Sequence, residues 1–429
     1  MLRQFGPLRE KFLRQRCEIL STLPQGEGFG PSQIRSNLRP LEISGQNIMA
    51  LDLETRTQLI ETVRRFVTEK CVPIEAKVSE DDRVPDEIIE EMKHLGLFGL
   101  SIPEEFGGLG LSMEEEVLVA FELGQTSPAF RSVIGTNVGI GSQGVVMFGT
   151  DEQKKEWLPK LASGETVASF ALTEPNAGSD AASVRTTAIR DGDHYVVNGT
   201  KRFITNAKRA GMFTLMARSD TSKKGATGIS AFIVPANTPG ITIGKSEKKM
   251  GQQGAHIHDV IFENARVPAR LRLGAEGEGF KVAMQVLDRG RLHISGVCIG
   301  VAERLIREAV NYAREREQFG QRLGDFQLVQ AMLADCKTEA YAARCMALDA
   351  ARKRDAGENV TLECAATKYF ASEMVGRVAD RAVQIFGGAG YVADYGIERF
   401  YRDVRIFRIY EGTSQIQQLV IARNLLKGD

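Results

Sequence analysis

No sign of charge dominates this chain of 429 residues, and the balance narrows the range of partners. Lysine and arginine together number 55, and aspartate and glutamate also number 55. A chain without a net field is not drawn as a whole to nucleic acid or to an anionic membrane surface. We therefore expect no nucleic-acid partner, and any anionic ligand must be held by local groups.

Paired cysteines and long apolar runs are also missing. The six cysteines are scattered and form no C-x-x-C pair, which argues against a disulfide framework and against a zinc site; they are Cys17, Cys71, Cys298, Cys336, Cys345 and Cys364. No apolar run approaches the roughly 18 to 20 residues that span a bilayer. The sequence thus predicts no structural metal, no membrane insertion and a reducing compartment, which we take to be the cytoplasm.

The first fifty residues differ in composition from the rest. MLRQFGPLREKFLRQR is rich in arginine and amphipathic, as a mitochondrial transit peptide would be, but Glu10 and Glu18 interrupt it. A translation start placed too early explains the segment equally well, because Met49 directly precedes the first strongly periodic helix. Residues 1–50 are therefore treated as an extension without an assigned role, and a transit peptide would move the protein to the mitochondrial matrix.

Three segments with different periodicity follow the extension. Residues 51–165 read as a helical domain, because apolar residues recur at helical spacing before Pro73, across Ile88–Leu95 and across Met113–Leu123. Residues 166–275 hold short runs of Val, Ile, Phe and Thr bounded by turn residues, which is typical of a small antiparallel barrel or sandwich.

The helical period returns in residues 276–429. The long helices expected there are Val297–Tyr312, Gln327–Arg354, Thr361–Phe386 and Ile416–Leu426. Four long helices with short links favour a bundle. Helices, then strands, then helices give an α+β arrangement rather than a parallel-sheet one.

The stretch VGIGSQG contains the spacing G-x-G-x-x-G, which often marks a dinucleotide-binding turn. That motif needs a buried strand just before it, but the preceding residues, FRSVIGTN, are partly polar and helical patterns surround them. Small residues on a packed helix or around a cavity explain Gly139, Gly141 and Gly144 more simply. We therefore expect no nicotinamide site here.

Three longer motifs carry more information: FALTEPNAGSD (170–180), GTKRFITN (199–206) and RIYEGTSQIQ (408–417). With DRGRLHISG, AREREQFGQ and QIFGGAGY, and in this order, they make residues 51–427 resemble the acyl-CoA dehydrogenase family, in its bacterial-type form linked to an electron-transfer flavoprotein. The resemblance implies an N-terminal helical domain, a middle antiparallel β-barrel domain and a C-terminal four-helix bundle. It also implies FAD as the cofactor.

Glu411 is the candidate catalytic base. Removing an α-proton and a β-hydride from a thioester requires a carboxylate on one side of the substrate and a flavin on the other. Some members of the family place this base just before the arginine that matches Arg291, but Gly290 stands there, so no carboxylate competes. The alternative is that Glu411 caps a helix beginning near Thr413.

The cofactor contacts are implied by the resemblance. One group surrounds the flavin ring and another, from a neighbouring subunit, reaches its diphosphate and adenine, which makes a homotetramer the expected state and a dimer the exception. Many relatives carry Trp where this chain has Phe203, which cannot donate a hydrogen bond. The candidates are Phe170, Leu172, Thr173, Gly178, Ser179, Phe203, Thr205, Arg316, Gln318, Phe319, Gln384, Gly387, Gly388, Thr413 and Gln415.

The substrate contacts are implied in the same way, at Ser179, Asp288, Arg291, Tyr410, Gly412 and Arg131. Arg131 stands out because its segment is otherwise uncharged and lines the acyl pocket in relatives. It falls where glutaryl-CoA dehydrogenases carry an Arg-Ser that holds a distal carboxylate. The alternative is that Arg131 pairs with a helical glutamate such as Glu122 or points to solvent at a helix start. His256 and His258 are expected to be ordinary loop or strand residues rather than metal ligands.

The resemblance implies oxidation of an acyl-CoA thioester to trans-2-enoyl-CoA, as in fatty acid β-oxidation, with electrons passed to an electron-transfer flavoprotein. A dicarboxylyl-CoA substrate that uses Arg131 is one alternative. An oxidase of the same fold, in which oxygen accepts the electrons, is another. A non-catalytic relative would be expected to lack the base, and Glu411 is present.

Overall fold

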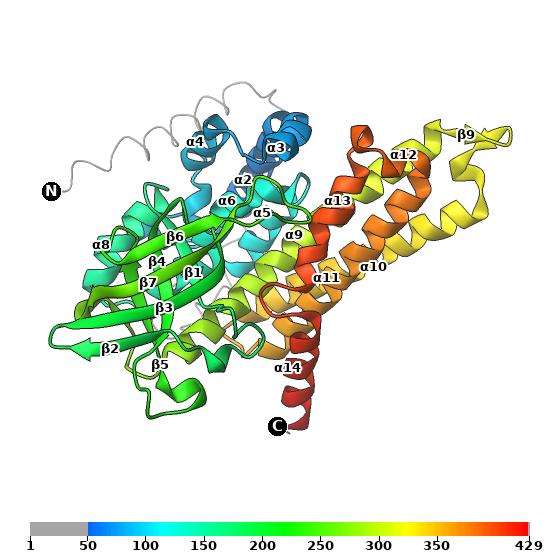
Figure 1. The fold of residues 1–429 in the computed structure, drawn as a ribbon. Helices are drawn as coiled ribbons and strands as arrows, with labels where there is room; N and C mark the ends of the chain where they lie inside the picture. Colours follow the sequence, from blue (N-terminus) through cyan, green and yellow to red (C-terminus); the bar gives the residue numbers. More distant parts are fainter. Residues whose placement is uncertain (1–49, 428–429) are drawn as a thin grey trace, which may run out of the picture. The chain divides into compact units, whose positions relative to one another are not determined.

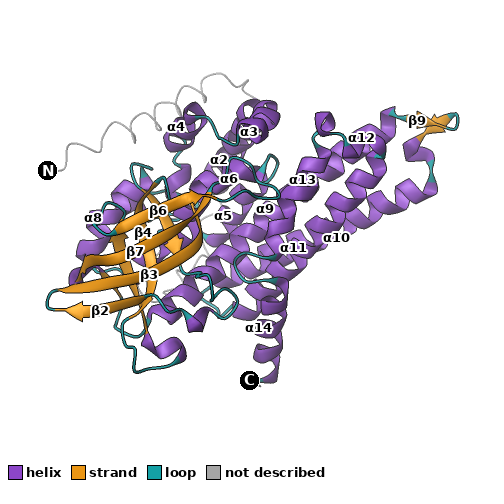
Figure 2. Cartoon of the chain, in the orientation of Figure 1, coloured by secondary structure: helices purple, strands orange, loops and turns teal. Residues whose placement is uncertain are grey.

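The computed structural model describes residues 50–427, in which a helical segment, a sheet and a second helical segment follow one another (Figure 1, Figure 2). The predictions made for residues 1–49 lie outside the described residues. The order of the three segments agrees with the α+β class expected from the sequence.

The first segment is a set of short helices. α5 begins at a capping box in which Ser112 and Glu115 satisfy each other's backbone N–H groups, and α6 begins with Pro128 after the N-cap Ser127. The elements are α2 (Leu53–Phe66), η1 (Val67–Cys71), η2 (Val72–Ile74), α3 (Glu75–Asp81), α4 (Asp86–His94), η3 (Leu97–Gly99), η4 (Glu104–Phe106), α5 (Met113–Leu123), α6 (Pro128–Gly135), η5 (Thr136–Gly141), α7 (Gln143–Phe148) and α8 (Asp151–Ala162).

The glycines of VGIGSQG lie in helical structure, on η5 and at the start of α7, as expected. A Cβ on Gly141 would lie 2.7 Å from the Ala168 side chain, so this glycine lets η5 pack closely against the sheet. Gly139 is buried, yet a Cβ there would meet no atom within 4 Å. Close packing therefore explains the glycine at position 141, and Gly139 borders open space.

The middle segment forms an eight-stranded sheet within the described residues: seven strands follow the order β6-β7-β3-β2-β4-β5-β8, and the eighth, β1, pairs with β4 outside this order. Its pairs are antiparallel except for β4 with β1 and β4 with β2. The elements are β1 (Val167–Ala171), η6 (Ala181–Ser183), β2 (Thr187–Asp191), β3 (His194–Thr205), β4 (Ala210–Arg218), η7 (Gly225–Gly228), β5 (Ile229–Pro235), β6 (Ile241–Ser246), β7 (Ile257–Pro268), η8 (Ala269–Leu271) and β8 (Arg272–Leu273).

The last segment contains the four long helices, and Figure 1 shows α9, α10 and α11 running side by side. Contacts between α9 and α11, between α10 and α11, and between α11 and α14 hold them together. The elements are α9 (Gly279–Glu315), β9 (Glu317–Gln318), β10 (Gln321–Arg322), η9 (Leu323–Asp325), α10 (Gln327–Asp355), α11 (Thr361–Phe386), α12 (Gly388–Tyr391), η10 (Ala393–Tyr395), α13 (Ile397–Asp403), η11 (Val404–Arg408) and α14 (Ser414–Leu426).

The helix α9 is longer than its apolar pattern predicts. The prediction began at Val297, but the helix begins at Gly279 and runs for 37 residues. The polar stretch before Val297 hides the period because Arg289 and Arg291 are buried and form ion pairs inside the protein. Charge in the sequence is therefore not a sign of a loop at this point.

α5 and α9 cross at a pair of glycines. A Cβ on Gly300 would lie 2.8 Å from the Gly124 Cα and closer still to the carbonyl oxygen of Phe121. A Cβ on Gly124 would in turn collide with the carbonyl oxygen of Val297. Because backbone atoms cannot give way as a flexible side chain can, this crossing requires both residues to be glycine.

We predict that Gly300→Ala lowers the free energy of unfolding by about 1–3 kcal/mol, because the added methyl group forces the two helices apart. Urea denaturation followed by circular dichroism measures this change. Gly139→Ala is the matched control, since it adds the same methyl group to a helical segment with open space around it. Equal stability of the two variants would show that the crossing tolerates a Cβ.

Candidate active site

Glu411 lies in the short turn between η11 and α14, and its backbone is held in an uncommon conformation. Its φ is 55°, a left-handed value that non-glycine residues adopt only when the surroundings impose it. Lys368 Nζ donates to the Gly412 carbonyl at 2.8 Å, and Gln417 Nε2 donates to the carbonyls of Glu411 and Gly412 at 3.0 Å each. Two side chains from α11 and α14 thus fix the turn.

The suggestion that Glu411 caps the following helix is wrong. The N-cap of α14 is Thr413, whose side chain accepts a hydrogen bond from the Ile416 N–H at 3.2 Å. The Glu411 carboxylate instead has a buried Oε2 that no described residue contacts through a hydrogen bond. A carboxylate that is not needed for capping is free to take part in chemistry.

The carboxylate of Glu411 occupies the space that a side chain at position 290 would fill. A Cβ on Gly290 would lie well inside 3.0 Å of Glu411 Oε2 and 3.2 Å from Ile140 Cγ2. Burial raises the pKa of the Glu411 carboxyl above its ordinary value, and the charges of Arg131 and Lys368 offset part of that rise. Gly290 therefore has two consequences: no carboxylate at position 290 can act as a competing base, and the Glu411 carboxylate has room.

Arg131 is buried beside this turn and has no partner among residues 50–427. Its side chain is 7% exposed, its Nε makes no hydrogen bond, and its guanidinium lies against Gly135. Glu122 pairs with Arg64 at 2.8 Å instead. The alternative of a pair with Glu122 or of an arginine in solvent is therefore wrong. A buried guanidinium without a counter-charge is costly.

Asp288 and Arg291, predicted to flank the substrate, form a salt bridge of 2.6 Å on α9. Asp288 also accepts a hydrogen bond from Thr361 Oγ1 at 3.1 Å and lines a cavity of about 180 Å³ with Arg354 and Asn359. Arg291 is buried, and its charge acts on Glu411. Asp288 therefore borders a small hollow, while its partner Arg291 acts electrostatically on the candidate base.

The predicted flavin-binding loop between β1 and η6 is anchored by Glu174. Its carboxylate accepts from Lys201 Nζ at 2.7 Å and from the backbone N–H groups of Arg185 and Thr186 at 2.6 and 2.9 Å. Burial alone would raise the pKa of Glu174, but Lys201 and these donors hold it below its ordinary value. This pair ties the loop to β3 near Thr173, and Gly178 and Ser179 are exposed in the same loop.

Phe203 and Thr205 lie on β3 beside that loop. The Arg202 N–H, next to Phe203, donates to the Thr173 carbonyl at 2.7 Å, and Ser169 Oγ donates to the Thr205 carbonyl at 2.7 Å. A β-bulge gives Phe203 a φ of 58° and leaves its ring 51% exposed. Bulges of this kind redirect a side chain next to a binding site.

The candidates on β9 and near the end of α11 lie far from Glu411 in the same chain. From Gly290 to Glu315 the helix α9 rises by about 38 Å, so Arg316, Gln318 and Phe319 stand at the opposite end of the bundle (Figure 1). Phe319 is 95% exposed. Gln384, Gly387 and Gly388 are exposed as well. These residues cannot complete a site around Glu411 of their own chain.

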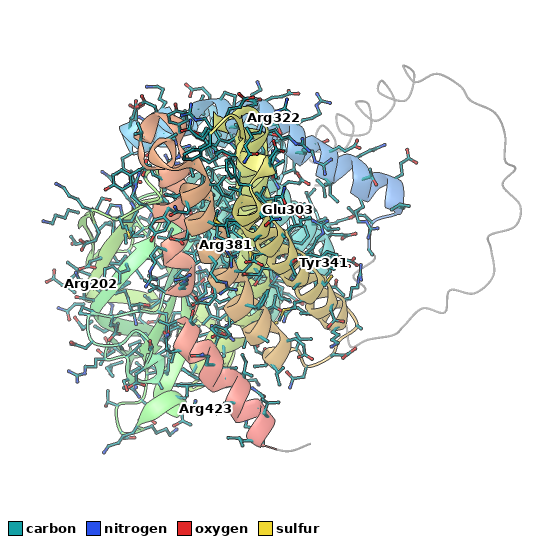
Figure 3. The ribbon with its side chains drawn as sticks, turned by 90° about the vertical axis from the view of Figure 1, so that its right-hand side faces the viewer. Arg202, Glu303, Arg322, Tyr341, Arg381 and Arg423 are labelled. Atoms are coloured by element: carbon teal, nitrogen blue, oxygen red, sulfur yellow. The ribbon has the colours of Figure 1, made fainter. Side chains whose placement is uncertain are left out.

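A hollow next to α11 and η11 is not lined by Glu411. Its volume is about 550 Å³, and Figure 3 labels one of its lining residues, Arg381 on α11, which pairs with Glu339 of α10 at 2.9 Å. It is lined by Met250, Gly376, Arg377, Asp380, Arg381, Tyr401, Val404, Arg405 and Arg408. The buried unpaired groups of Glu411 and Arg131 lie elsewhere, and a ligand is needed where such groups lack a partner.

Several contributors were missed by sequence reasoning. Lys368, Gln417 and Glu174 act on the backbone around the site, and a side chain that orients a backbone carbonyl has no distinctive spacing in a sequence. Asn206, the last residue of GTKRFITN, also holds backbone in place. Its Nδ2 donates to the Ser132 carbonyl at 2.8 Å and to Thr136 Oγ1 at 2.9 Å, which joins the end of β3 to α6 and η5.

The two histidines of GAHIHD have ordinary partners. His256 Nε2 lies 2.7 Å from the Asp82 carbonyl oxygen, and His258 Nδ1 lies 2.9 Å from the Gly244 carbonyl oxygen. The residues that the structure describes contain no group of three or more His, Cys, Asp or Glu that could hold a metal ion, and no helix long and apolar enough to cross a membrane.

Three family models match consecutive parts of the chain. The acyl-CoA dehydrogenase N-terminal domain matches residues 54–165, the middle domain matches residues 169–265, and the C-terminal domain matches residues 277–426. Together the matches span the helical segment, the sheet and the bundle.

The alignments with similar proteins extend over almost the whole length of those proteins. Acryloyl-CoA reductase (NADH) from Anaerotignum propionicum is 43% identical over 90% of this chain and 99% of its own. An acyl-CoA dehydrogenase from Bacillus subtilis is 40% identical over 87% and 99%. The caffeyl-CoA reductase-Etf complex subunit CarC from Acetobacterium woodii is 41% identical over 87% and 98%.

Solved structures of related enzymes have the same fold. Butyryl-CoA dehydrogenase from Megasphaera elsdenii has a TM-score of 0.84 at 36% identity, covering 90% of this chain and 100% of that one. A glutaryl-coenzyme A dehydrogenase in complex with glutaryl-CoA has a TM-score of 0.83 at 34% identity, covering 89% and 98%.

The raised pKa of Glu411 predicts that Glu411→Gln stabilises the protein at neutral pH. Since the folded-state pKa lies above the unfolded value, ionisation lowers the free energy of unfolding as pH rises through that range, and glutamine removes this penalty. Thermal unfolding from pH 4 to 8 should show an advantage at neutral pH that vanishes in acid. The control is Glu105→Gln, at an exposed position. A variant less stable than wild type at pH 7.5 would mean that the carboxylate has a stabilising partner.

Proposed function

Because the chain belongs to the acyl-CoA dehydrogenase family, we propose that it is a flavin-dependent oxidoreductase that converts an acyl-CoA thioester to trans-2-enoyl-CoA. The observation that carries the proposal is the Glu411 carboxylate, which is buried, unpaired within the described chain and located where Gly290 leaves it room. Its raised pKa suits a group that must accept a proton near neutral pH. Glu411 removes the proton from the α-carbon.

The turn that holds Glu411 also offers a hydrogen-bond donor. Both carbonyls of the turn are occupied by Lys368 and Gln417, while the Glu411 N–H donates to no residue of the described chain. A backbone donor beside the base can bind the thioester carbonyl oxygen and stabilise the negative charge that develops on it. The turn therefore orients the base and polarises the substrate.

FAD is the cofactor of the proposed reaction, and when bound it supplies the acceptor for the hydride that leaves the β-carbon. The loop with Thr173, Gly178 and Ser179, together with Phe203 and Thr205, would hold its ring. Phe170 and Leu172 directly precede that loop, and Thr413 and Gln415 follow Glu411 in the sequence. The residues fit such a group: a Cβ on Gly178 would meet no atom within 4 Å, and the Phe203 ring is half-exposed.

We propose that subunits share the flavin sites. Arg316, Gln318 and Phe319 are too far from Glu411 of their own chain, yet an arginine fork and an exposed aromatic ring suit a dinucleotide. Gln384, Gly387 and Gly388 are exposed at the same end of the bundle. A homotetramer would bring these residues to a neighbour's flavin.

The cysteines support the compartment that we propose. Five free cysteines among the described residues suit a reducing compartment such as the cytoplasm.

We propose an electron-transfer flavoprotein as the electron partner, because a 41% identical relative is named as a subunit of an Etf complex. Relatives include both dehydrogenases and reductases. The same carboxylate serves either direction, since a base that removes the α-proton returns it in reverse. An oxidase would form peroxide without any added acceptor, so a peroxide assay in air separates that alternative.

Glu411→Gln is expected to retain flavin and bind acyl-CoA, but to lose about 10²- to 10⁴-fold in the rate at which acyl-CoA bleaches the flavin under anaerobic conditions. Stopped-flow absorbance measures this rate. Gly290→Ala should lower it as well, because the methyl group displaces an intact carboxylate. Glu105→Gln should leave the rate unchanged. Rapid bleaching by Glu411→Gln would refute the base and with it the proposed reaction.

A second candidate concerns the substrate: we propose an acyl chain that ends in a carboxylate. The specific observation is Arg131, buried within the range of Glu411 and without an ion pair in the described chain. A carboxylate would supply the missing counter-charge and accept two parallel hydrogen bonds from the guanidinium. A chain ending in a methyl group would leave Arg131 unpaired.

We predict that glutaryl-CoA has a higher kcat/KM than pentanoyl-CoA, which has the same number of acyl carbons and no carboxylate. Arg131→Met should lower kcat/KM for glutaryl-CoA by an amount equivalent to about 2–5 kcal/mol of transition-state stabilisation. The kcat/KM for pentanoyl-CoA should stay unchanged or rise. Butyryl-, octanoyl- and isovaleryl-CoA complete the panel. Activity confined to monocarboxylic thioesters and unchanged in Arg131→Met would eliminate the carboxylate proposal while leaving the dehydrogenase proposal intact.

A further inference from the structure

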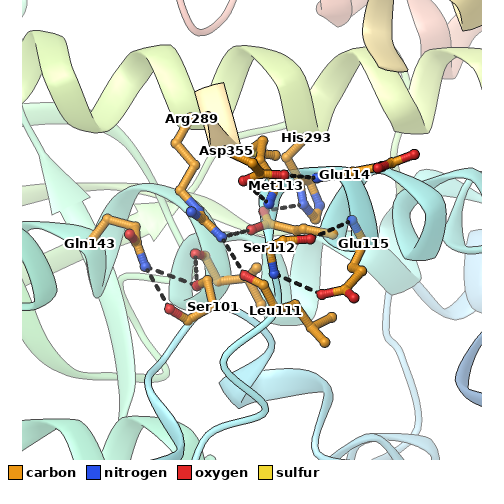
Figure 4. A network of polar contacts seen from close by, with 12 residues as sticks. Ser101, Leu111, Ser112, Met113, Glu114, Glu115, Gln143, Arg289, His293 and Asp355 are labelled. Carbon is orange, nitrogen blue, oxygen red and sulfur yellow. Dashed lines mark hydrogen bonds and ion pairs between the residues drawn. The ribbon is translucent and has the colours of Figure 1, made fainter. Parts of the chain in front are cut away.

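His293 is a buried histidine with one free nitrogen. It lies on α9 one turn after Arg289, and Figure 4 shows both side chains pointing from α9 toward the segment with Ser112 and Met113. Its side chain is 0% exposed. Its Nδ1 lies 2.8 Å from Glu116 Oε1, while its Nε2 is buried without a partner among the described residues. An imidazole in this position has one engaged and one unsatisfied nitrogen.

Glu116 determines which nitrogen carries the proton. Arg289 binds its other oxygen, and although burial alone would raise the pKa of Glu116, Arg289 and His293 lower it to about 2. An ionised carboxylate can only accept, so Nδ1 must donate and Nε2 of the neutral ring is a bare acceptor. Nδ1 and Nε2 flank the same carbon, but the N–H bond of one and the lone pair of the other diverge widely, so the Nε2 lone pair points away from Glu116.

The charged groups around His293 leave it neutral without a ligand. They are Glu116 on α5, Arg131 on α6 and Arg289 on its own helix. Burial lowers the pKa of His293, the Arg131 charge lowers it further, and Glu116 only partly opposes this. Arg131 is thus near enough to repel a proton from His293, and it is itself unpaired.

We infer that His293 binds a proton at Nε2 when the carboxylate end of the acyl chain binds beside Arg131, so that the arginine and the imidazolium hold the carboxylate together. This inference rests on the carboxylate substrate proposed above. The proton comes from solvent, and the new N–H bond at Nε2 gives the ligand a second donor. Glu116, already bound to Nδ1, is the counter-charge behind the ring.

The charge balance supports this arrangement. Glu116 and Arg289 cancel each other, so Arg131 is the unbalanced charge near His293 before a ligand binds. A carboxylate beside Arg131 offsets the repulsion that adds to burial in keeping the ring neutral, and it would otherwise face the lone pair of Nε2. A buried lone pair opposite a carboxylate is unfavourable, whereas a charged hydrogen bond is among the stronger ones in proteins.

The experiment is isothermal titration calorimetry of the flavin-loaded Glu411→Gln enzyme, which cannot turn substrate over by the proposed route. Glutaryl-CoA and pentanoyl-CoA are titrated at pH 7.5 in two buffers that differ in ionisation enthalpy, which gives the number of protons bound. We expect glutaryl-CoA binding to take up about one proton more than pentanoyl-CoA binding. The Kd for glutaryl-CoA should then rise about tenfold per pH unit on the alkaline side.

The matched variant is His293→Asn in the same background. Its amide N–H can still donate to Glu116, but it cannot be protonated, so proton uptake should disappear and the Kd should lose its pH dependence. The flavin spectrum and thermal unfolding check that the variant folds, and His293→Gln, which places its amide near Nε2, is the second variant. A variant that folds and still takes up the proton would overturn the inference.

Two other results are decisive. Tight glutaryl-CoA binding without proton uptake would refute the role of His293 while leaving the Arg131 proposal intact. Equal affinities for glutaryl-CoA and pentanoyl-CoA would refute the carboxylate substrate and the inference together. Neither result concerns Glu411 as the base, which the flavin-bleaching experiment tests separately.

Discussion

The burial of the Glu411 carboxylate without a direct partner is the constraint on which the rest of the site depends. Burying an ionised carboxylate away from water costs free energy, so the packing of the surrounding chain must offset that cost. It does so with a turn that is fixed at its carbonyl oxygens rather than at the carboxylate. Lys368 and Gln417 bind those carbonyls, and the side chain is left to the ligand.

The positions of these groups follow from the helix packing. Gly290 on α9 gives the carboxylate room, Lys368 on α11 fixes the turn, and the close crossing at Gly124 and Gly300 sets α5 against α9. Lys368 is itself buried, and burial lowers its pKa to about 8. The charges of Arg131 and Lys368 favour the ionised form of Glu411 without forming an ion pair with it, so the carboxyl pKa is raised less than burial alone would raise it.

The sequence predicted the parts of the molecule that have a period or a motif. The order of helices, sheet and helices, and the span Met113–Leu123 of one helix, agree with the structure. The start of α9 was missed because paired charges broke the apolar pattern. The environment of Arg131 could not be read from its neighbours in the chain either, since Glu122 is nine residues away in the sequence but pairs with Arg64.

Tertiary contacts decide what such residues do, and the α9 helix illustrates why. Residues 289, 290 and 293 lie within about one turn of each other, yet one neutralises Glu116, one makes room for Glu411, and one presents an unpaired nitrogen. A helix turn points its side chains in different directions, so adjacent residues meet different partners. Because α5, η5 and α11 pack against α9, a change in one of these charges acts on the others. The protonation of the substrate end and the protonation of the base are therefore coupled through Arg131, whose charge acts on both His293 and Glu411.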